Sequence, residues 1–494
     1  MGDVFLIRAQ FLDFIGDPLA TDSPPDRAVR FVPDGLLAID QESGRIVDFG
    51  AYAACAPRYQ KAPDLALTDR LIVPGFIDAH VHYPQLRIPG AYGGQLFEWW
   101  YRWVLPEEIR FEDPTYARAV ADDFLDEMLR AGTTTCLAFT TIHAVATEAL
   151  FDAASRRGMR IVTGLTGLDL LVPERYSISA EAYAFESRRL IQRYHGKDRL
   201  LYAVTPRYAL GCSHDMLNAT RDLLLEFEGL WLNTHLAECP AEVEAGRERF
   251  TDHADLTAVF EDYGLLGPRF VGGHGVWLSD DEFRRIARSG AAISHCPSSN
   301  LFLGSGLFRT GKALDPSQRV PIALGSDLAG GPGLSLIRVM GDAYRVAMQN
   351  QVACEAVKSL ETLATGVTGH RLDPLQLLYL ATLGAAKALH LENWLGNFEP
   401  GKEADFVIIN PQNGPSLRTC AQHQADQQAQ ASTPLEALRD RLFRMMMMGD
   451  EGAIESTWVC GRPAVIRGVP LSDPGDAASP TDFGQPHDSR IDRP

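Results

Sequence analysis

Short apolar runs alternate with amphipathic stretches through the central part of the chain. The apolar runs have the length of buried strands, and the stretches between them carry hydrophobic positions at helical spacing and often end in glycine. The expected strands are 71–76, 133–139, 160–165, 201–205, 231–234, 270–273, 291–294 and 322–325. Eight strands alternating with helices predict an α/β fold, a (β/α)8 barrel of TIM type. The alternative is an open, doubly wound sheet, but no Gly-x-Gly-x-x-Gly follows an early strand.

The two ends of the chain have a different pattern. Short strand-like runs separated by Gly and Pro turns fill the first 70 residues, and the same pattern returns at 395–411 and 456–468. We therefore expect residues 1–70 and 390–470 to form one small β-sandwich-like domain, and residues 71–389 to form the barrel. The Gln- and Ala-rich segment 413–435 is expected to be a loop or a mobile insertion. The polar segment 471–494 is expected to be a disordered tail.

The composition is that of a globular protein with an acidic surface. Of the 494 residues, 46% are hydrophobic, and 64 acidic against 46 basic residues give a net charge of −18. This charge argues against binding to nucleic acids or to anionic membranes. No apolar run approaches the roughly 20 residues that cross a bilayer. The eight cysteines are scattered without a Cys-x-x-Cys and no signal peptide is visible, so we expect reduced thiols and a cytoplasmic location.

Two histidines one residue apart follow the first apolar run. Side chains at i and i+2 of an extended segment point to the same side, so His80 and His82 can reach one metal ion. On its own this pattern is short, and two unrelated loop histidines would match it equally well. The other strand ends therefore decide its meaning.

Further ionisable residues come at or just past the ends of other predicted strands, namely His235, His274 and Asp327. A barrel carries its reactive residues at the carboxyl ends of its strands. Each residue alone is more often structural, but five of them on four strand ends predict a shared site. Imidazoles with a carboxylate suit a catalytic Zn²⁺, with Fe²⁺ as the alternative. Such an ion lowers the pKa of a bound water to about 7.

A proton carrier is expected near this site. Glu238 lies three residues after His235, and if the chain turned into a helix there, the two side chains would share a face. Glu238 could then act as a general acid and base, provided that burial raised its pKa. A solvated glutamate that opens the next helix explains the spacing equally well.

Several motifs together resemble the amidohydrolase superfamily, and within it the guanine deaminases. They are PGFIDAHVHYPQ, AGTTTCLAFTTIH, PRY, THLAE, GGHGVWLS, HCPSSNLFLGSG and LGSDLAGG. The resemblance runs from about residue 71 to residue 350. It implies a hydrolase that acts on C–N bonds of cyclic amidines and converts guanine, a small-molecule purine, to xanthine and ammonia.

The resemblance also implies roles for individual residues. Glu238 would protonate the ring nitrogen beside C2 of guanine, and Asp327 would take a proton from the attacking water. His274 would hydrogen-bond that water and orient it. One Zn²⁺ per chain would be held by His80, His82, His235 and Asp327.

For the substrate, the resemblance implies hydrogen bonds from Gln85 and Arg207 to the base, with the ring lying against Tyr208. A flat ring with a rim of donors and acceptors suits one aromatic plate and two forked polar groups. Two residues depart from the pattern, because Tyr208 stands where Phe is usual and Cys239 where Asn is expected. The motifs that carry the metal ligands are intact.

The segment LFEWWYRWVLPEE at 96–108 also departs from the usual pattern. Trp99, Trp100 and Trp103 could reshape the pocket, or they could pack a lid against the barrel. Deamination of another aminated heterocycle, such as an oxidised guanine, a pterin or an s-triazine, therefore stays open as an alternative. A metal-free scaffold is a further alternative, but such a chain would have lost ligands. The resemblance makes a homodimer plausible.

Overall fold

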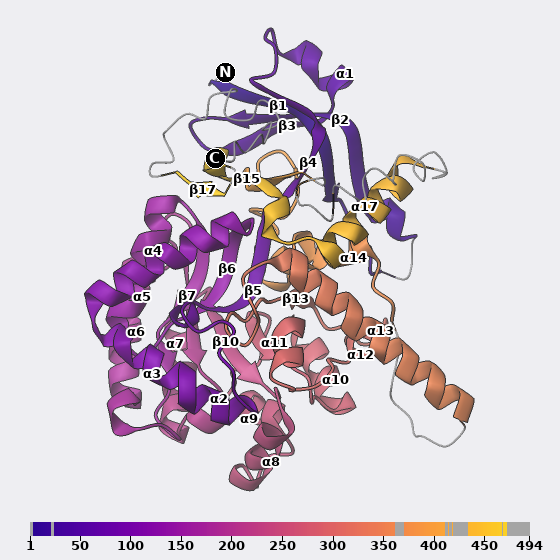
Figure 1. Cartoon of the computed structure of the whole chain (residues 1–494). Coiled ribbons are helices and arrows are strands. Elements are labelled where there is room, and N and C mark those ends of the chain that lie inside the picture. Colours follow the sequence, from indigo (N-terminus) through magenta and orange to yellow (C-terminus); the bar gives the residue numbers. More distant parts are fainter. Residues whose placement is uncertain are drawn as a thin grey trace, which may run out of the picture.

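Two sheets organise the chain, one in a barrel and one beside it (Figure 1). The computed structural model describes residues 3–20, 24–360, 370–410, 413, 417, 433–466 and 468–471, and of 353–360 the backbone only. The predicted insertion 413–435 and the predicted tail 471–494 lie almost wholly outside the described residues. Among the described helices, none has both the length and the apolar character of a membrane span.

Parallel strands form the barrel. In sheet order they are β5 (Phe76–His82), β6 (Thr133–Phe139), β7 (Arg160–Gly164), β9 (Leu200–Pro206), β10 (Trp231–Leu236), β11 (Phe270–His274), β12 (Ala292–His295) and β13 (Ile322–Leu324), with β8 (Thr166–Gly167) paired to β9. The last strand returns to the first, because the backbone N–H of Asp327 donates to the carbonyl of His80 over 2.9 Å. The predicted (β/α)8 barrel is confirmed.

Helices wrap the outside of the barrel (Figure 1). Helix α10 (Asp280–Ser289) begins at a capping box of Ser279 and Glu282, and it ends at the left-handed Gly290, as the terminal glycines of the predicted helices indicated. Before β9, α1 (Tyr52–Cys55) lies beside the second sheet, away from the barrel, and the other helices are α2 (Leu96–Trp99), α3 (Leu105–Ile109), α4 (Pro114–Arg130), α5 (Ala144–Arg157) and α6 (Ala180–Tyr194). The later ones are α7 (His214–Glu226), α8 (Pro240–Arg249), α9 (Leu256–Asp262), α10 (Asp280–Ser289), α11 (Pro297–Phe302), α12 (Thr310–Ala313), α13 (Leu336–Leu360), α14 (Pro374–Leu380), α15 (Leu383–Ala388) and α17 (Pro434–Met448).

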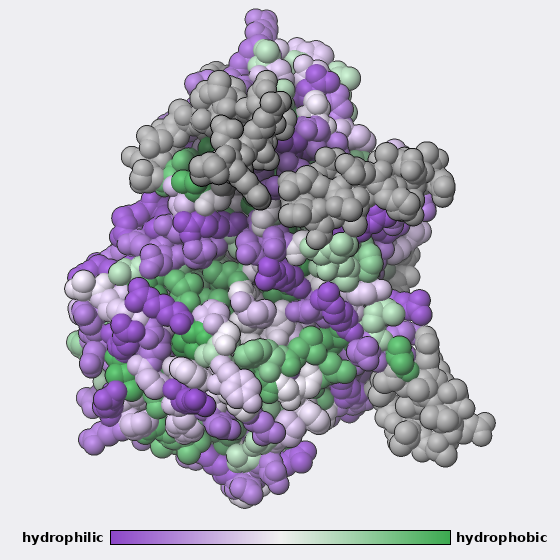
Figure 2. All heavy atoms as spheres, in the orientation of Figure 1, coloured by the Kyte–Doolittle hydropathy of each residue, from purple (hydrophilic) through white to green (hydrophobic). Residues whose placement is uncertain are grey.

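The second sheet joins the two ends of the chain, as the sequence pattern predicted. Its strands, in order, are β17 (Val469–Pro470), β16 (Arg462–Ile466), β15 (Ile454–Val459), β14 (Phe406–Ile409), β4 (Leu65–Pro74), β1 (Val4–Phe14), β2 (Val29–Asp40) and β3 (Arg45–Ala51). In Figure 1 the indigo N-terminal strands and the yellow C-terminal strands lie in this one layer above the barrel. Hydrophilic side chains cover much of the visible surface around both parts (Figure 2).

The predicted first barrel strand, 71–76, is wrong. Leu71 to Pro74 belong to β4 of the small sheet, where they pair with β14, and the barrel begins with β5 at Phe76. Gly75 lies between the two strands, where the chain passes from the small sheet to the barrel. A Cβ there would lie 2.2 Å from the hydroxyl oxygen of Thr134, so a larger residue would not fit. Both stretches are apolar and buried, so hydrophobicity alone could not divide them between two sheets.

A buried ion-pair cluster fastens the amino-terminal side of the barrel strands to the second sheet. Arg160, at the start of β7, pairs with Glu403 over 2.5 Å. Arg199, just before β9, pairs with Asp405 over 2.5 Å and with Glu403 over 2.9 Å. At least nine-tenths of each of these four side chains is buried, so the charges must be compensated within the cluster.

Candidate active site

The five predicted strand-end residues converge at one place. His80 and His82 lie within β5, His235 lies within β10, His274 ends β11, and Asp327 follows β13. Asp327 Oδ1 lies 3.5 Å from His80 Nε2 and 3.3 Å from His82 Nε2. His82 Nε2 lies 3.1 Å from His235 Nε2. The histidines lie inside the strands or on their last residues rather than beyond them. The direction of each imidazole is therefore set by the alternation of side chains along its strand.

The backbone is strained at the strand ends that carry this site. His274, Asp327 and Ala237 have φ angles of 70°, 45° and 49°, in the left-handed region. Such conformations cost about 1–3 kcal/mol each and persist only where the surrounding structure enforces them. Here they turn the chain sharply at the strand ends, where the side chains of the site lie.

The donor set fits a divalent metal ion. His80, His235 and His274 form one group whose nitrogens lie within 4.8 Å of one another, and His80, His82 and Asp327 form a second, overlapping group of the same closeness. Both ring nitrogens of His80 are buried without a hydrogen-bond partner, an arrangement that is costly unless an ion occupies the position. Imidazole nitrogens with a carboxylate are the ligands that Zn²⁺ and Fe²⁺ accept.

The protonation states favour the same conclusion. Burial lowers the pKa of His82 to about 3 and also lowers that of His80, so these imidazoles are neutral, as ligation requires. Burial acts to raise the pKa of Asp327, but the close approach of His80 and His82 outweighs burial and holds that pKa well below its usual range. His235 Nδ1 lies 2.7 Å from the carbonyl of Arg207, which leaves Nε2 for the site.

Glu238 lies at the site, but it is on a loop and not on the predicted helix. His235 is in β10, and α8 begins only at Pro240, so Glu238 stands in the loop between them, after the left-handed Ala237. Its side chain is buried, with Oε2 3.6 Å from His274 Nε2 and the hydroxyl of Ser305 3.4 Å from Oε1. Burial raises its pKa, which suits a group that must both hold and release a proton. A solvated glutamate at the start of a helix is therefore excluded.

His274 is held in place by a residue that the sequence did not single out. Its Nδ1 lies 2.9 Å from the side-chain oxygen of Asn300, which is on α11 in the HCPSSN motif, and its Nε2 faces Asp327 Oδ2 at 3.8 Å. Burial lowers the pKa of His274, but the charges of Glu238 and Asp327 outweigh burial and raise it. The charges of these two carboxylates therefore favour the protonated form of His274.

Of the predicted substrate residues, Arg207 and Tyr208 line the pocket at these groups, and Gln85 is not among its lining residues. Arg207 follows β9 and is buried, and Tyr208 beside it is half-buried and bridges to His235 through the backbone. Gln85, in the short turn after β5, is also buried, and its Nε2 donates to Glu108 over 3.2 Å. Glu108, which lies in the predicted lid segment, also accepts from Nη1 of Arg207 over 3.1 Å and is thus a contact of two predicted substrate residues.

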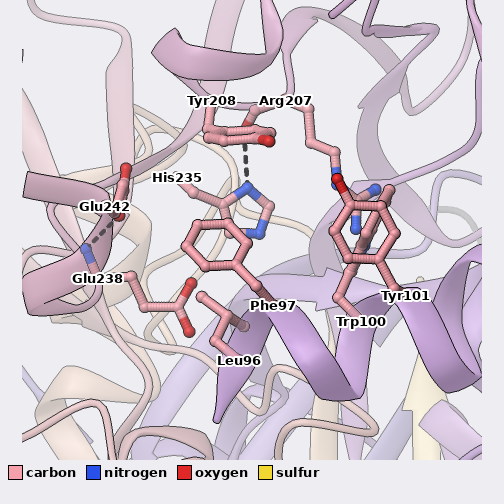
Figure 3. A pocket seen from close by; sticks show the side chains of 9 residues that line it. All are labelled: Leu96, Phe97, Trp100, Tyr101, Arg207, Tyr208, His235, Glu238 and Glu242. Atoms are coloured by element: carbon pink, nitrogen blue, oxygen red, sulfur yellow. Dashed lines mark hydrogen bonds between the residues drawn. The ribbon is translucent and has the colours of Figure 1, made fainter. Parts of the chain in front are cut away.

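A pocket opens over the site, and a helical segment covers it (Figure 3). Arg207, Tyr208, His235, Glu238 and Glu242 form one part of its lining; Leu96, Phe97, Trp100 and Tyr101, from α2 and the π-helical turn after it, form the rest. Glu242, on α8, accepts a hydrogen bond from the backbone N–H of Glu238 over 2.7 Å. The lining combines aromatic faces with charged groups, as expected for a flat polar ligand.

The three tryptophans of the lid segment have different surroundings. Trp99 is buried against Ile88 and Val104, and Trp103 donates to the carbonyl of Tyr92 over 2.9 Å. Trp100 instead lines the pocket, and the guanidinium carbon of Arg207 lies 5.3 Å from its ring centre. Lid packing accounts for the first two, while Trp100 shapes the pocket, which spacing alone could not reveal.

The fold and the site together define a metal-dependent barrel hydrolase. The chain belongs to the amidohydrolase family, which it matches over residues 71–463 and whose members depend on a metal ion. It is 36% identical over 469 residues to the guanine deaminase of Escherichia coli (strain K12), with 92% of this chain and 96% of that protein covered. It is 42% identical to the crystal structure of guanine deaminase from Bradyrhizobium japonicum, with a TM-score of 0.88 and with 94% of this chain and 99% of that one covered. The resemblance drawn from the sequence motifs is confirmed.

Proposed function

We propose that this protein catalyses the hydrolytic deamination of guanine to xanthine and ammonia. The observation that carries the proposal is the convergence of His80, His82, His235, Asp327 and Glu238 in a chain that matches guanine deaminases over more than nine-tenths of its length. The reaction adds the oxygen of water to C2 of the ring and breaks the bond from C2 to the exocyclic nitrogen. The amine leaves as ammonia, and the ring keeps the oxygen as a carbonyl.

For the metal, we propose one Zn²⁺ per chain, with Fe²⁺ as the alternative. The residues that would hold it are His80, His82, His235 and Asp327, whose ligand atoms face one another. When bound, the ion supplies Lewis-acid activation of water at neutral pH. The unpartnered nitrogens of His80 support this assignment.

Three side chains would handle protons. Asp327 is charged and can take a proton from the water as its oxygen adds to C2. Glu238, whose pKa is raised by burial, would deliver a proton to the ring nitrogen beside C2 and then help the amine leave. His274, fixed by Asn300, would orient the water through Nε2, which faces both carboxylates. The burial of all three groups excludes bulk water from these transfers.

The base would be held by Arg207 and Gln85 at its rim and by the ring of Tyr208 at its face. Arg207 and Tyr208 line the pocket, and Gln85 is tied to Arg207 through Glu108. Phe is usual at the position of Tyr208, and either ring offers the same aromatic face.

Steady-state kinetics on guanine, with xanthine identified as the product and with the metal content of the purified protein determined, test this proposal. A panel that includes an oxidised guanine, a pterin and an s-triazine tests the substrate. Turnover of one of these in place of guanine would overturn the assignment, and a chain without metal would favour a scaffold.

Three further predictions from the sequence remain predictions. They are the division of the chain into two domains near residues 70 and 390, the cytoplasmic location and the homodimer. Strand β4 continues past residue 70 as far as Pro74, so limited proteolysis should not cleave there. Sedimentation would give the oligomeric state.

A further inference from the structure

A fully buried carboxylate lies behind the pocket and has no part in the chemistry above. Glu108, on α3, is 0% exposed. Its Oε1 and Oε2 each lie 3.1 Å from Nη1 of Arg207, and its Oε1 accepts from Nε2 of Gln85 over 3.2 Å. The hydroxyl of Tyr176 also donates to its Oε2. Three donors from three separate segments of the chain therefore meet on one carboxylate.

This arrangement dictates which end of the Gln85 amide is left for the base, which the proposed function assigns to Gln85 and Arg207 together. A carboxylate held against a guanidinium only accepts hydrogen bonds, so the NH₂ end of Gln85 must face Glu108. The carbonyl end is then the free end, and among the described residues no group donates to it. Glu108 thus leaves Gln85 as an acceptor for a bound base.

Arg207 is constrained in the same way. Its Nη1 is directed at Glu108, and its guanidinium lies 5.3 Å from the ring centre of Trp100, so the plane of the group is held from two sides. A guanidinium has only donors. A base held by these two residues would therefore meet an acceptor from Gln85 and donors from Arg207 in a fixed relation.

We propose that Glu108 is a positioning residue that fixes the hydrogen-bond polarity of the substrate pocket, so that the pocket accepts a ring with an N–H donor beside a carbonyl acceptor. This inference rests on the proposed function. Guanine has that pattern, with N1–H beside the C6 carbonyl. 2,6-Diaminopurine carries the same C2 amine but presents the reverse pattern, an unprotonated N1 beside an amino group. Glu108 acts on selectivity through Gln85 and Arg207 without touching the reacting atoms.

The test is the variant Glu108→Gln, which keeps the shape of the side chain. A glutamine at this position can donate as well as accept, so the Gln85 amide is free to turn over and Arg207 loses its charged partner. We expect kcat/KM for guanine to fall about 10- to 100-fold, the effect of losing a hydrogen bond to a charged group, mostly through KM. We also expect the preference for guanine over 2,6-diaminopurine, measured by turnover or by competitive inhibition, to fall at least about tenfold.

The matched control is Glu107→Gln, at the residue of α3 that precedes Glu108. Glu107 pairs with Arg110 over 2.9 Å outside the pocket, so this variant should keep the wild-type kinetics and selectivity. A Glu108→Gln variant with wild-type selectivity would overturn the proposal, whether or not its overall activity falls. If that variant does not fold, Tyr176→Phe removes one donor from the carboxylate and should shift the selectivity in the same direction by about threefold; unchanged selectivity in a folded Tyr176→Phe would also overturn it. A wild-type protein that does not turn over guanine would instead reject the deaminase assignment itself.

Discussion

Replacing Glu238 by glutamine removes a proton carrier while leaving the site in place. The glutamine has the same length, and it can keep the contact that Ser305 makes with Oε1 at 3.4 Å. The backbone N–H of residue 238 still donates to Glu242 over 2.7 Å, so the loop keeps its anchor. The change therefore removes the carboxylate that faces His274 at 3.6 Å and little else.

The magnitude follows from the proposed role. A positioned general acid and base contributes about 10²–10⁴-fold to a rate, which is about 3–5 kcal/mol of the barrier at roughly 1.4 kcal/mol per tenfold. We expect kcat for guanine to fall by that factor while KM changes little, because Glu238 is not assigned to hold the base. The loss of guanine absorbance in the ultraviolet measures the rate, and metal analysis shows whether the ligands still hold their ion.

The control is Glu248→Gln, an exposed glutamate on the same helix α8 that Glu242 belongs to. It makes the same chemical change away from the site and should leave the kinetics as they are. A Glu238→Gln variant that keeps its metal and turns guanine over within threefold of wild type would refute the role given to Glu238.

Other substitutions test the ligands, the aromatic face and the base of the barrel. His82→Ala should lower the metal content of the purified protein at least about tenfold, since even indirect partners of a ligand contribute that much. Tyr208→Ala should reduce kcat/KM for guanine roughly 5- to 150-fold, because stacking on a base contributes about 1–3 kcal/mol, whereas Tyr208→Phe should remain near wild type. Glu403→Gln should lower the free energy of unfolding by about 3–5 kcal/mol in denaturant titrations. The substitution leaves Arg160 and Arg199 buried without enough negative charge to compensate their positive charges.

The ion pairs of Glu403 also predict a pH dependence. Burial acts to raise its pKa, but Arg199 and Arg160 outweigh burial and hold it below the ordinary value. A carboxyl whose pKa is lower in the folded state stabilises the protein above the ordinary pKa and loses that contribution as the pH falls through the folded value. Glu403→Gln should therefore destabilise most at neutral pH and progressively less in acid.

Each of these predictions has a contrary result. Retention of a full complement of metal by His82→Ala would remove His82 from the ligand set. A Tyr208→Ala variant with the wild-type kcat/KM would show that the base does not lie on this ring. A change in unfolding free energy under about 0.5 kcal/mol for Glu403→Gln, the range of surface substitutions, would show that the cluster is not needed for stability.

The sequence by itself was enough for the barrel, for the joined ends and for the convergence of the strand-end histidines and Asp327. Strand and helix periods differ, so the alternation of the two could be followed along the chain, and each histidine of the site stood at the end of an apolar run. Parallel strands in a closed barrel bring those ends together, which is why local patterns at positions 80, 235 and 327 could predict one site.

Only the tertiary structure decided the residues that orient the site. Glu108, Asn300 and Glu242 carry no local signal, because what they do depends on which distant donors meet them across the fold. Leu71–Pro74 and Phe76–His82 are equally apolar, and only pairing to different sheets separates them. Local hydrophobicity records that a residue is buried, whereas the partner that it is buried against is set by packing between elements far apart in the chain.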